Sequence, residues 1–295
     1  MRIGLLGTGP WAHLAHAPAL AAHPALEFAG VWGRRADAAK ALAAEYGVRA
    51  YDDVDALISD VDAVAVALPP DIQAELATRA ARAGRHLLLD KPLALSSREG
   101  RELVEAARES GAASVVFFTA RFDPVISAWI GEQAAADGWF TARAEWLGAV
   151  FTSAGSPFAE SAWRREKGAL WDVGPHALSV LLPVLGDVTR VGAAVHGPGD
   201  TVFLVLEHAG GASSTLTLSL TAPEAASGNA VELRGESGVA VLPEGVSDAV
   251  GALSGAVDAL LEAVASGRPH ACDAGFALRV TEVLEAAEGV LGVGE

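Results

Sequence analysis

Cysteine, basic residues and long apolar runs are all scarce in this chain. Cys272 is the single cysteine, which excludes an internal disulfide and any cysteine-rich metal site. Lys and Arg number 21 against 37 Asp and Glu, which gives a formal net charge of −16 at pH 7. This balance argues against nucleic-acid binding through phosphate neutralisation and against docking on anionic membranes. It is typical of a protein whose surface charge keeps it soluble.

Membrane spans and targeting segments are also lacking. No uninterrupted apolar run reaches the ~20 residues of a membrane-crossing helix. The N-terminal segment reaches Gly7 too soon for a secretory signal peptide, so we expect a cytoplasmic protein. The 295 residues are 51% hydrophobic, which is enough for a large core and favours two domains.

Strands and helices alternate through the first part of the chain. Apolar runs predict strands at 2–6, 27–32, 61–68, 86–89 and 114–118. The stretches between them predict helices at 13–22, 38–46, 72–83 and 97–110, the second of them capped by Asp37. This alternation predicts an α/β fold whose N-terminal domain is a Rossmann doubly wound parallel sheet with right-handed crossovers.

A glycine-rich turn joins the first strand to the first helix. Gly7 and Gly9 are followed by Ala12, while Pro10 and Trp11 fill positions that need no glycine. Between a strand and a helix this spacing is the dinucleotide fingerprint, because small residues let a pyrophosphate approach the backbone and the helix N-terminus. The alternative is an ordinary tight turn.

The end of the second strand bears on the choice of cofactor. A carboxylate there would bind the ribose 2′-hydroxyl of NAD, and this chain has Gly33, Arg34 and Arg35 instead. Guanidinium groups pair with phosphate in a fork and stack on adenine, so the sequence favours NADP(H) over NAD(H). The alternative is a pair of solvated surface arginines.

The pattern changes after residue 120. Short runs separated by turn signals predict strands at 139–147, 188–195, 201–207, 213–221, 230–234 and 239–242, and two helices at 250–265 and 273–289. They predict a C-terminal α+β domain with an open, mostly antiparallel sheet. The expected domains are 1–120, which binds NADP, and 121–295, which binds substrate and mediates oligomerisation, with the C-terminal helix able to pack back on the first domain. An uncovered sheet face favours a homodimer or homotetramer.

The stretch from Gly168 to Ser179 holds an acid and a histidine four residues apart. Asp172 and His176 would share one face of the apolar helix that they begin. There the carboxylate would orient the imidazole, and the two groups would move a proton together. The alternatives are a helix-capping role for Asp172 and a buried structural role for His176.

Five motifs follow one another along the chain. They are the glycine-rich turn at 7–12, Leu68-Pro69-Pro70, the run at 84–94 that contains Asp90-Lys91-Pro92, Arg121-Phe122-Asp123-Pro124, and the stretch at 168–179. Taken together they resemble the glucose–fructose oxidoreductase / inositol dehydrogenase (Gfo/Idh/MocA) family over nearly the whole chain. Asp90 stands in place of the glutamate of that family's Glu-Lys-Pro signature. The chain departs from the family at Gln73, where histidine is common, and at Ser179, where many members have a second acid.

The resemblance implies an NAD(P)-dependent oxidoreductase acting on CH–OH groups. Lys91 would hydrogen-bond the reacting oxygen, His176 would be the general acid–base, and Asp172 would orient His176 or bind a neighbouring hydroxyl. The cofactor site is expected to comprise Gly7, Gly9, Pro10, Trp11, Ala12, Gly33, Arg34, Arg35, Leu68, Pro69, Lys91 and Pro92. The substrate site is expected to comprise Lys91, Arg121, Arg164, Asp172 and His176.

Two further groups carry weaker signals. His13 and His16 share a helix face, but no acid or cysteine lies near them in the sequence, so we expect no metal site. The cluster of Arg164, Arg165 and Lys167 would bind a phosphate on the substrate or form a solvated loop.

The function that the sequence favours is hydride transfer between NADP(H) and a hydroxyl or keto carbon of a sugar, cyclic polyol or sugar derivative. One alternative is a non-catalytic NAD(P)-binding sensor of the same fold. Another is a reductase of a non-sugar carbonyl or an imine. A small-molecule substrate is expected in the first and last cases, and neither nucleic acid nor a membrane in any of them.

Overall fold

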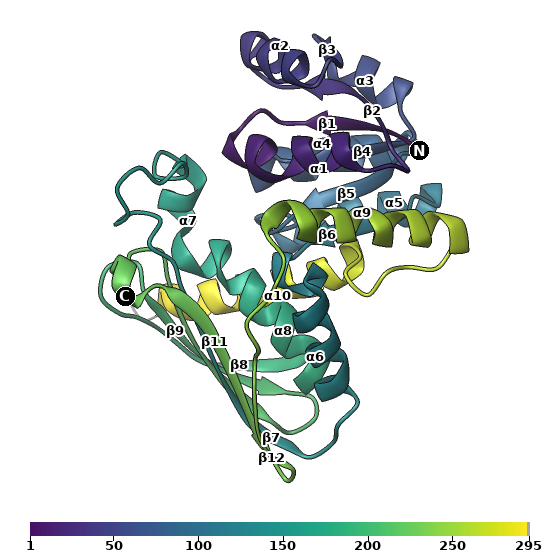
Figure 1. The fold of residues 1–295 in the computed structure, drawn as a ribbon. Coiled ribbons are helices and arrows are strands. Elements are labelled where there is room, and N and C mark those ends of the chain that lie inside the picture. Colours follow the sequence, from purple (N-terminus) through teal and green to yellow (C-terminus); the bar gives the residue numbers. More distant parts are fainter. Residues whose placement is uncertain (294–295) are drawn as a thin grey trace. The chain divides into compact units, whose positions relative to one another are not determined.

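The computed structural model describes residues 1–293, which form two compact units (Figure 1). The first unit comprises Met1–Asp123 and Ser247–Arg279, and the second comprises Pro124–Val246 and the residues from Val280 onward. The chain therefore passes between the units three times, whereas the sequence predicts one boundary after residue 120, with the C-terminal helix able to pack back on the first domain. The difference arises because residues 247–279 return to the first unit, where their apolar side chains are buried.

A parallel six-stranded sheet forms the centre of the first unit. Its strands run in the spatial order β3-β2-β1-β4-β5-β6, and every adjacent pair is parallel. They are β1 (Arg2–Leu6), β2 (Glu27–Trp32), β3 (Arg49–Tyr51), β4 (Ala63–Val66), β5 (His86–Asp90) and β6 (Ser114–Phe117). The central strands are mostly apolar, with residues 3–6 of β1 and all four residues of β4 buried, because helices cover both of their faces. The Rossmann prediction is confirmed.

The helices of this unit alternate with the strands, and those at 54–60 and 119–122 are not among the helices that the sequence predicts. They are η1 (Ala12–His16), α1 (Ala17–Ala22), α2 (Ala36–Glu45), α3 (Val54–Asp60), α4 (Pro70–Arg82), α5 (Ser97–Ser110), η2 (Thr119–Phe122) and α9 (Ala249–Ser266). The helix predicted at 13–22 begins as a π-helical turn, η1, and continues as α1. Asp37 is not the cap of α2, because Arg35 holds that position and Asp37 lies in the first turn.

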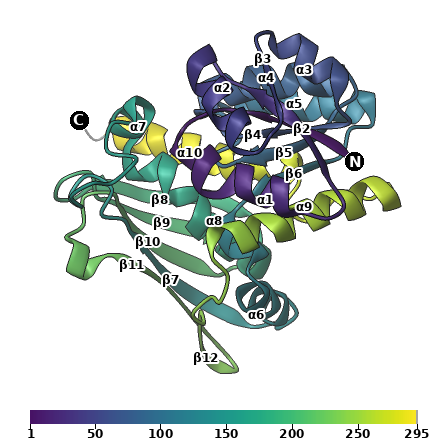
Figure 2. The same cartoon turned by 45° about the horizontal axis from the view of Figure 1, so that its top comes forward.

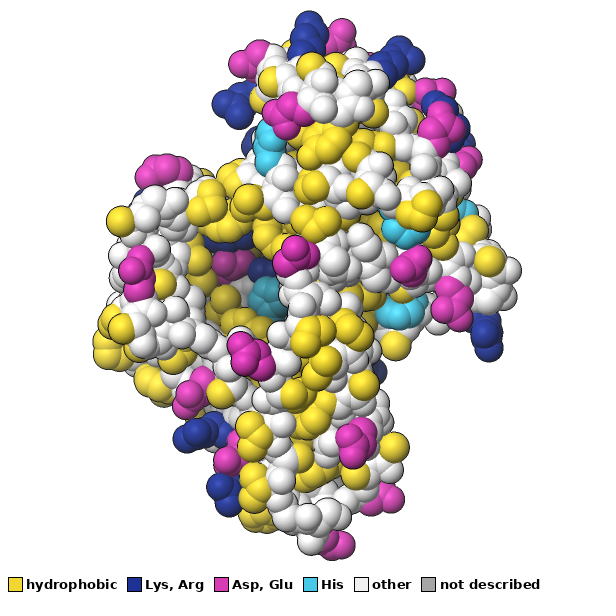
Figure 3. Space-filling view, viewed as in Figure 1, with side chains coloured by type: hydrophobic (Ala, Val, Ile, Leu, Met, Phe, Trp, Pro, Cys, Tyr) yellow, Lys and Arg dark blue, Asp and Glu magenta, His cyan; other side chains and the backbone are white. Residues whose placement is uncertain are grey.

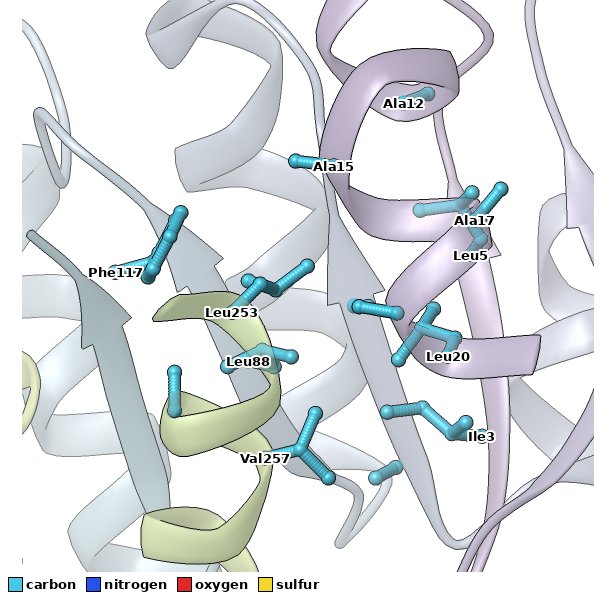
Figure 4. Packing of buried hydrophobic residues seen from close by; sticks show 14 of the residues in the cluster. Ile3, Leu5, Ala12, Ala15, Ala17, Leu20, Leu88, Phe117, Leu253 and Val257 are labelled. Carbon is cyan, nitrogen blue, oxygen red and sulfur yellow. The ribbon is translucent and has the colours of Figure 1, made fainter. Parts of the chain in front are cut away.

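Helix α9 completes the core of the first unit although it lies more than 120 residues after β6 in the sequence. Leu253 and Val257 of this helix join a buried cluster that includes Leu20, Leu88 and Phe117 (Figure 4). Figure 4 also shows the small side chains of η1 and α1 facing this cluster, where alanine lets the helix lie close to the sheet.

The second unit is built on a mixed, mostly antiparallel sheet (Figure 2). Its strands are β7 (Trp139–Leu147), β8 (Val188–His196), β9 (Val202–His208), β10 (Ser213–Ser219), β11 (Gly228–Gly235) and β12 (Gly238–Val241), in the order β12-β11-β7-β10-β9-β8. Only the pair β10 and β7 is parallel among the described strands of this sheet. The α+β prediction is thus confirmed.

The helices of the second unit gather on one side of its sheet (Figures 1 and 2). They are α6 (Pro124–Ala134), α7 (Ala162–Asp172), α8 (Gly174–Leu185) and the later turns of α10 (Ala274–Val293), with a short η3 (Glu224–Ala226) in a loop. Helix α8 contacts α6 and β7, and nine of its residues are buried. This packing explains why its sequence is apolar on nearly every side.

Two helical stretches are long and apolar enough for a membrane span, contrary to the sequence-based expectation. One is 162–185, where α7 and α8 follow each other, and the other is α9. The first has 83% of its apolar window buried, as in the core helix of a soluble protein, and the second has 39% buried. Each stretch qualifies as a membrane span by its length and composition alone, and this is weak evidence that it crosses a membrane.

Candidate active site

The turn after β1 is shaped by two glycines that differ in what surrounds them. Gly7 has a φ of 130°, and a Cβ on it would lie 2.3 Å from the carbonyl oxygen of Ala67, so only glycine fits. No atom lies within 4 Å of the point where a Cβ of Gly9 would stand. Ala12 is fully buried where the following helix meets the sheet. Open space over Gly9 beside a helix N-terminus is a cradle that fits a phosphate group.

The end of β2 presents two arginines beside this turn. A Cβ on Gly33 would lie 2.7 Å from Cγ2 of Thr8, so the small residue lets the turn after β1 and the end of β2 lie close together. Arg34 and Arg35 are exposed. Within residues 1–293, neither of these guanidinium groups pairs with a carboxylate, which leaves their donors available to an anion.

The predicted cofactor-binding segments all lie at one edge of the first sheet. The segments 7–12, 33–35, 68–69 and 91–92 follow the carboxyl ends of β1, β2, β4 and β5. These four strands are neighbours in the order β2-β1-β4-β5, and they are parallel. Ligands of such sheets bind outside the carboxyl ends of the strands, at the point where the strand order reverses. That point lies here between β1 and β4.

Aromatic side chains line the first turn of η1 on its inner side. Trp11 stacks on Phe117 with ring centroids 6.4 Å apart, and the edge of His16 meets the same phenyl ring. His16 is fully buried, and its Nε2 lies 3.6 Å from Oδ2 of Asp90. The buried histidine thus joins the first helical turn to the residue that precedes Lys91.

Lys91 stands directly after β5, in a loop whose backbone is tightly bonded. The peptide bond between Lys91 and Pro92 is cis. The backbone N–H of Lys91 donates to Oδ1 of Asp90 at 2.8 Å. Gln73, from helix α4, is buried against the same loop. The sequence marked Gln73 only as a departure from the family, and no local pattern indicates its contacts, because they depend on the packing of α4 beside β5.

Asp172 and His176 do not share one helix, which corrects the sequence prediction. Helix α7 ends at Asp172, Val173 separates the two helices, and His176 lies in the first turn of α8. The sequence contains the signal for this break, because Gly174 and Pro175 form the start of α8. A second interruption occurs at Gly168, whose φ of 63° and ψ of −162° are not helical.

Asp172 is held by an arginine from the start of α7. Nε of Arg164 donates to Oδ2 of Asp172 at 2.8 Å, and the two side chains are 18% and 6% exposed. The Arg164 guanidinium also lies over the rings of Phe158 and Trp163, at 4.7 and 4.6 Å from their centroids. Arg164, a predicted substrate-binding residue, therefore fixes the predicted catalytic acid.

His176 is fixed by an aromatic ring and by its own helix. Trp146, from β7, stacks on the imidazole with centroids 5.5 Å apart and planes inclined by 10°. Oγ of Ser179 donates to the backbone carbonyl of His176 at 2.7 Å. Ser179, which replaces the acid of many family members, thus supports the turn that carries the histidine.

The other residues that the sequence singles out do not form a common site in the structure. Arg165 pairs with Glu160 and Lys167 with Glu288, so these two cations have separate partners rather than forming one phosphate site with Arg164. Arg121 lies over the ring of Phe276, 5.4 Å from its centroid. In residues 1–293, no group of three or more His, Cys, Asp or Glu side chains could hold a metal ion, and this includes the two histidines of η1.

Comparison with known proteins assigns both units. The family model described as "Oxidoreductase family, NAD-binding Rossmann fold" matches residues 1–118. The model of the GFO/IDH/MocA C-terminal domain matches residues 126–241. The chain belongs to the GFO/IDH/MocA oxidoreductase family. Its members include enzymes named as sugar reductases and inositol dehydrogenases.

Individual relatives agree with this assignment. The chain is 34% identical over 207 residues to a dTDP-3,4-didehydro-2,6-dideoxy-α-D-glucose 3-reductase of Streptomyces violaceoruber, which covers 66% of this chain and 57% of the relative. For the next two curated relatives, the chain spans 35% and 34% of their lengths.

Solved structures share the fold over the full length. The structure of GenD2 from gentamicin A biosynthesis, in complex with NAD, has a TM-score of 0.86 at 23% identity and covers 100% of this chain and 95% of that one. Levoglucosan dehydrogenase in complex with NADH and levoglucosan has a TM-score of 0.87 at 19% identity, with 99% and 97% covered.

Proposed function

We propose that this protein is an NADP-dependent oxidoreductase that transfers a hydride between the nicotinamide and a hydroxyl or keto carbon of a sugar, cyclic polyol or sugar derivative. The observation that carries the proposal is the open cradle over Gly9, which shares its sheet edge with Lys91. The nicotinamide, when bound, supplies or accepts the hydride. The remaining tasks fall to the chain itself.

Three side chains divide the handling of the substrate oxygen and its proton. The Lys91 ammonium donates to the reacting oxygen and stabilises the negative charge that develops on it. The His176 imidazole removes the hydroxyl proton in oxidation and returns it in reduction. Asp172 orients the imidazole or a neighbouring substrate hydroxyl, and Arg164 holds that carboxylate in place.

The proposed preference for NADP(H) is supported by Arg34 and Arg35. Both are exposed at the end of β2, where the adenosine ribose of a cofactor on such a sheet lies. A 2′-phosphate would receive their fork-shaped donors, whereas the residues directly after β2, 33–36, include no carboxylate for a 2′-hydroxyl. Substitution Arg34→Ala should raise the Kd for NADP⁺ at least tenfold and leave that for NAD⁺ within twofold. Tighter binding of NAD⁺ than of NADP⁺ by the unaltered protein would refute the preference.

The proposed substrate class has support from the relatives. One of them is named for a dTDP-linked dideoxy sugar and another for UDP-N-acetylglucosamine. The test is a panel of sugars and polyols with NADP⁺ or NAD⁺, and of keto sugars with the reduced cofactors, followed by absorbance of the reduced nicotinamide. His176→Ala should lose turnover by a factor of at least a hundred with unchanged cofactor affinity. Turnover within a few-fold of the wild type would refute the role of His176.

The proposed assembly is a homo-oligomer formed through the second sheet. Val195, Phe203 and Val205 on β8 and β9, with Val239 and Val241 on β12, are 40–58% exposed on its open face. Apolar groups on a sheet face favour burial against a second copy.

We place the protein in the cytoplasm with a small molecule as its partner. Figure 3 shows acidic and basic side chains interspersed on the face in view, in keeping with a protein that binds no nucleic acid.

A further inference from the structure

Gln73 lies beneath the loop that carries Lys91. It belongs to the first turns of α4, and only 1% of its surface is exposed. Its Nε2 lies 2.7 Å from the carbonyl oxygen of Asp90, 3.0 Å from that of Pro92 and 3.3 Å from that of Leu93. Its Oε1 accepts the backbone N–H of Asp90 at 2.9 Å. One side chain thus bonds the backbone on both sides of Lys91.

The orientation of this amide follows from its neighbours. The reversed orientation would turn Oε1 toward three carbonyl oxygens and Nε2 toward an N–H group, so every contact would be repulsive. With the NH₂ group facing the carbonyls, two hydrogens serve three acceptors, and one hydrogen is shared. A carboxylate has no hydrogen for these acceptors, and an imidazole has at most two, in a different geometry.

Lys91 can act on a reacting oxygen only if its backbone is held in one place. The long, flexible side chain of a lysine already has many rotamers. Movement of the loop would further increase the number of positions that the ammonium group can occupy, and so lower the population of the productive one. The hydrogen bonds from Gln73 to the backbone of Asp90, Pro92 and Leu93 restrict the movement of the loop and so remove this contribution. His16, 3.6 Å from Asp90, packs against the same residue from the side of η1.

We propose that Gln73 is a positioning residue for Lys91. Through its amide it holds residues 90–93 in the conformation from which the Lys91 ammonium reaches the substrate oxygen. The catalytic consequence rests on the function proposed above, whereas the effect on the loop does not. Gln73 itself touches neither substrate nor cofactor in this assignment.

The loop is tested by backbone hydrogen exchange on the full chain. Gln73→Leu keeps the approximate volume and removes all four contacts, so the Asp90 amide should exchange at least tenfold faster than in the wild type. Thr78→Val is the matched control, because Thr78 is a buried polar residue of the same helix whose hydroxyl donates to the carbonyl of Ala74, away from the loop. It should leave exchange in residues 87–94 unchanged. Equal exchange at Asp90 in wild type and Gln73→Leu would overturn the proposal.

Kinetics separate positioning from general damage. Gln73→Leu should lower kcat at least tenfold while the Kd for the cofactor rises by a smaller factor, because only Lys91 and Pro92 of the expected cofactor site lie in the loosened loop and the turn at Gly7–Ala12 is untouched. Faster exchange with an unaltered kcat would show that the tie has no role in positioning Lys91. A wild-type protein inactive on every substrate and cofactor pair would refute the proposed function alone, since the exchange experiment still decides whether Gln73 holds the loop.

Gln73→Glu supplies a second variant with a distinct signature. At high pH its carboxylate would face three carbonyl oxygens, and below the pKa that this burial raises, its neutral form can donate one hydrogen bond. The ratio of its exchange rate at Asp90 to that of wild type should therefore fall as the pH is lowered from 8 to 6. A ratio that is constant across this range would contradict a role for the amide hydrogens.

Discussion

Nε of Arg164 donates to Oδ2 of Asp172 across the irregular turn at Gly168, and both side chains are largely removed from water. A charge-assisted bond in such a setting stabilises the carboxylate and fixes its direction. The pair has one member in the first turn of α7 and one at its end. The shape of the chain between them therefore decides where the acid points.

Removal of the arginine tests this relationship. Arg164→Met should lower kcat at least tenfold and reduce the free energy of unfolding by about 1–3 kcal/mol, because Asp172 would keep its burial and lose a partner. Arg165→Met is the control, since Arg165 is exposed and pairs with an exposed glutamate. It should change neither quantity. Steady-state kinetics and urea denaturation measure both, and equal kcat values for the two variants would refute the role of Arg164.

The backbone at Gly168 gives a second prediction. Its φ and ψ of 63° and −162° are costly for any residue with a Cβ, although no atom lies within 4 Å of the place where one would stand. Gly168→Ala should therefore destabilise the protein by about 1–3 kcal/mol through backbone strain alone. Gly131→Ala, in regular helix α6 with the same open surroundings, should be neutral or stabilising by up to ~1 kcal/mol. Denaturant unfolding of both variants gives the comparison.

The stack of Trp146 on His176 predicts a kinetic effect without an effect on cofactor binding. Trp146→Leu removes the flat surface that fixes the imidazole, so kcat should fall about tenfold, as expected when a general acid–base loses its orientation. Trp139→Leu, on the same strand with its indole N–H bonded to Gln133, should leave kcat within twofold. Similar kcat values for Trp146→Leu and the wild type would show that the stack has no part in orientation.

His208 predicts a pH dependence of stability. Its Nδ1–H donates to the carbonyl of Gly186 and its Nε2 accepts from Ser214, while burial lowers the pKa of the ring below 6.5. The unfolded chain then binds a proton that the folded chain does not, so stability falls as the pH drops below 6.5. His208→Gln should be less stable at pH 8 but lose less stability between pH 7 and 5. His196→Gln, at an exposed position, should keep the wild-type slope.

The sequence predicted those parts of the fold and site that depend on neighbours in the chain. The apolar runs of β1, β4 and β5 and the glycine spacing at 7–12 are local signals, and the structure brings the segments after these strands to one sheet edge. Strand β3 was missed because three residues, two of them polar or aromatic, give too short a pattern.

Long-range packing accounts for the rest. In the sequence, Gln73 is an ordinary polar residue of a helix, and its role becomes visible only in the packing of α4 beside β5. Arg164 likewise belongs to a basic cluster in the sequence, and only the folded α7 shows its bond to Asp172. The break between Asp172 and His176 was signalled by Gly174 and Pro175, but the apolar sequence after them favoured one continuous helix.

Helix α9 supplies Leu253, Val257 and Leu260 to a core whose other members come almost entirely from residues 1–123. During synthesis, those 123 residues emerge from the ribosome long before the helix that covers them has been translated. One apolar face of the nascent Rossmann sheet therefore stays exposed to solvent while the whole of the second sheet is synthesised. The first unit is complete only once residues 247–279 have been made, and the second unit only after that, with the residues from Val280 onward.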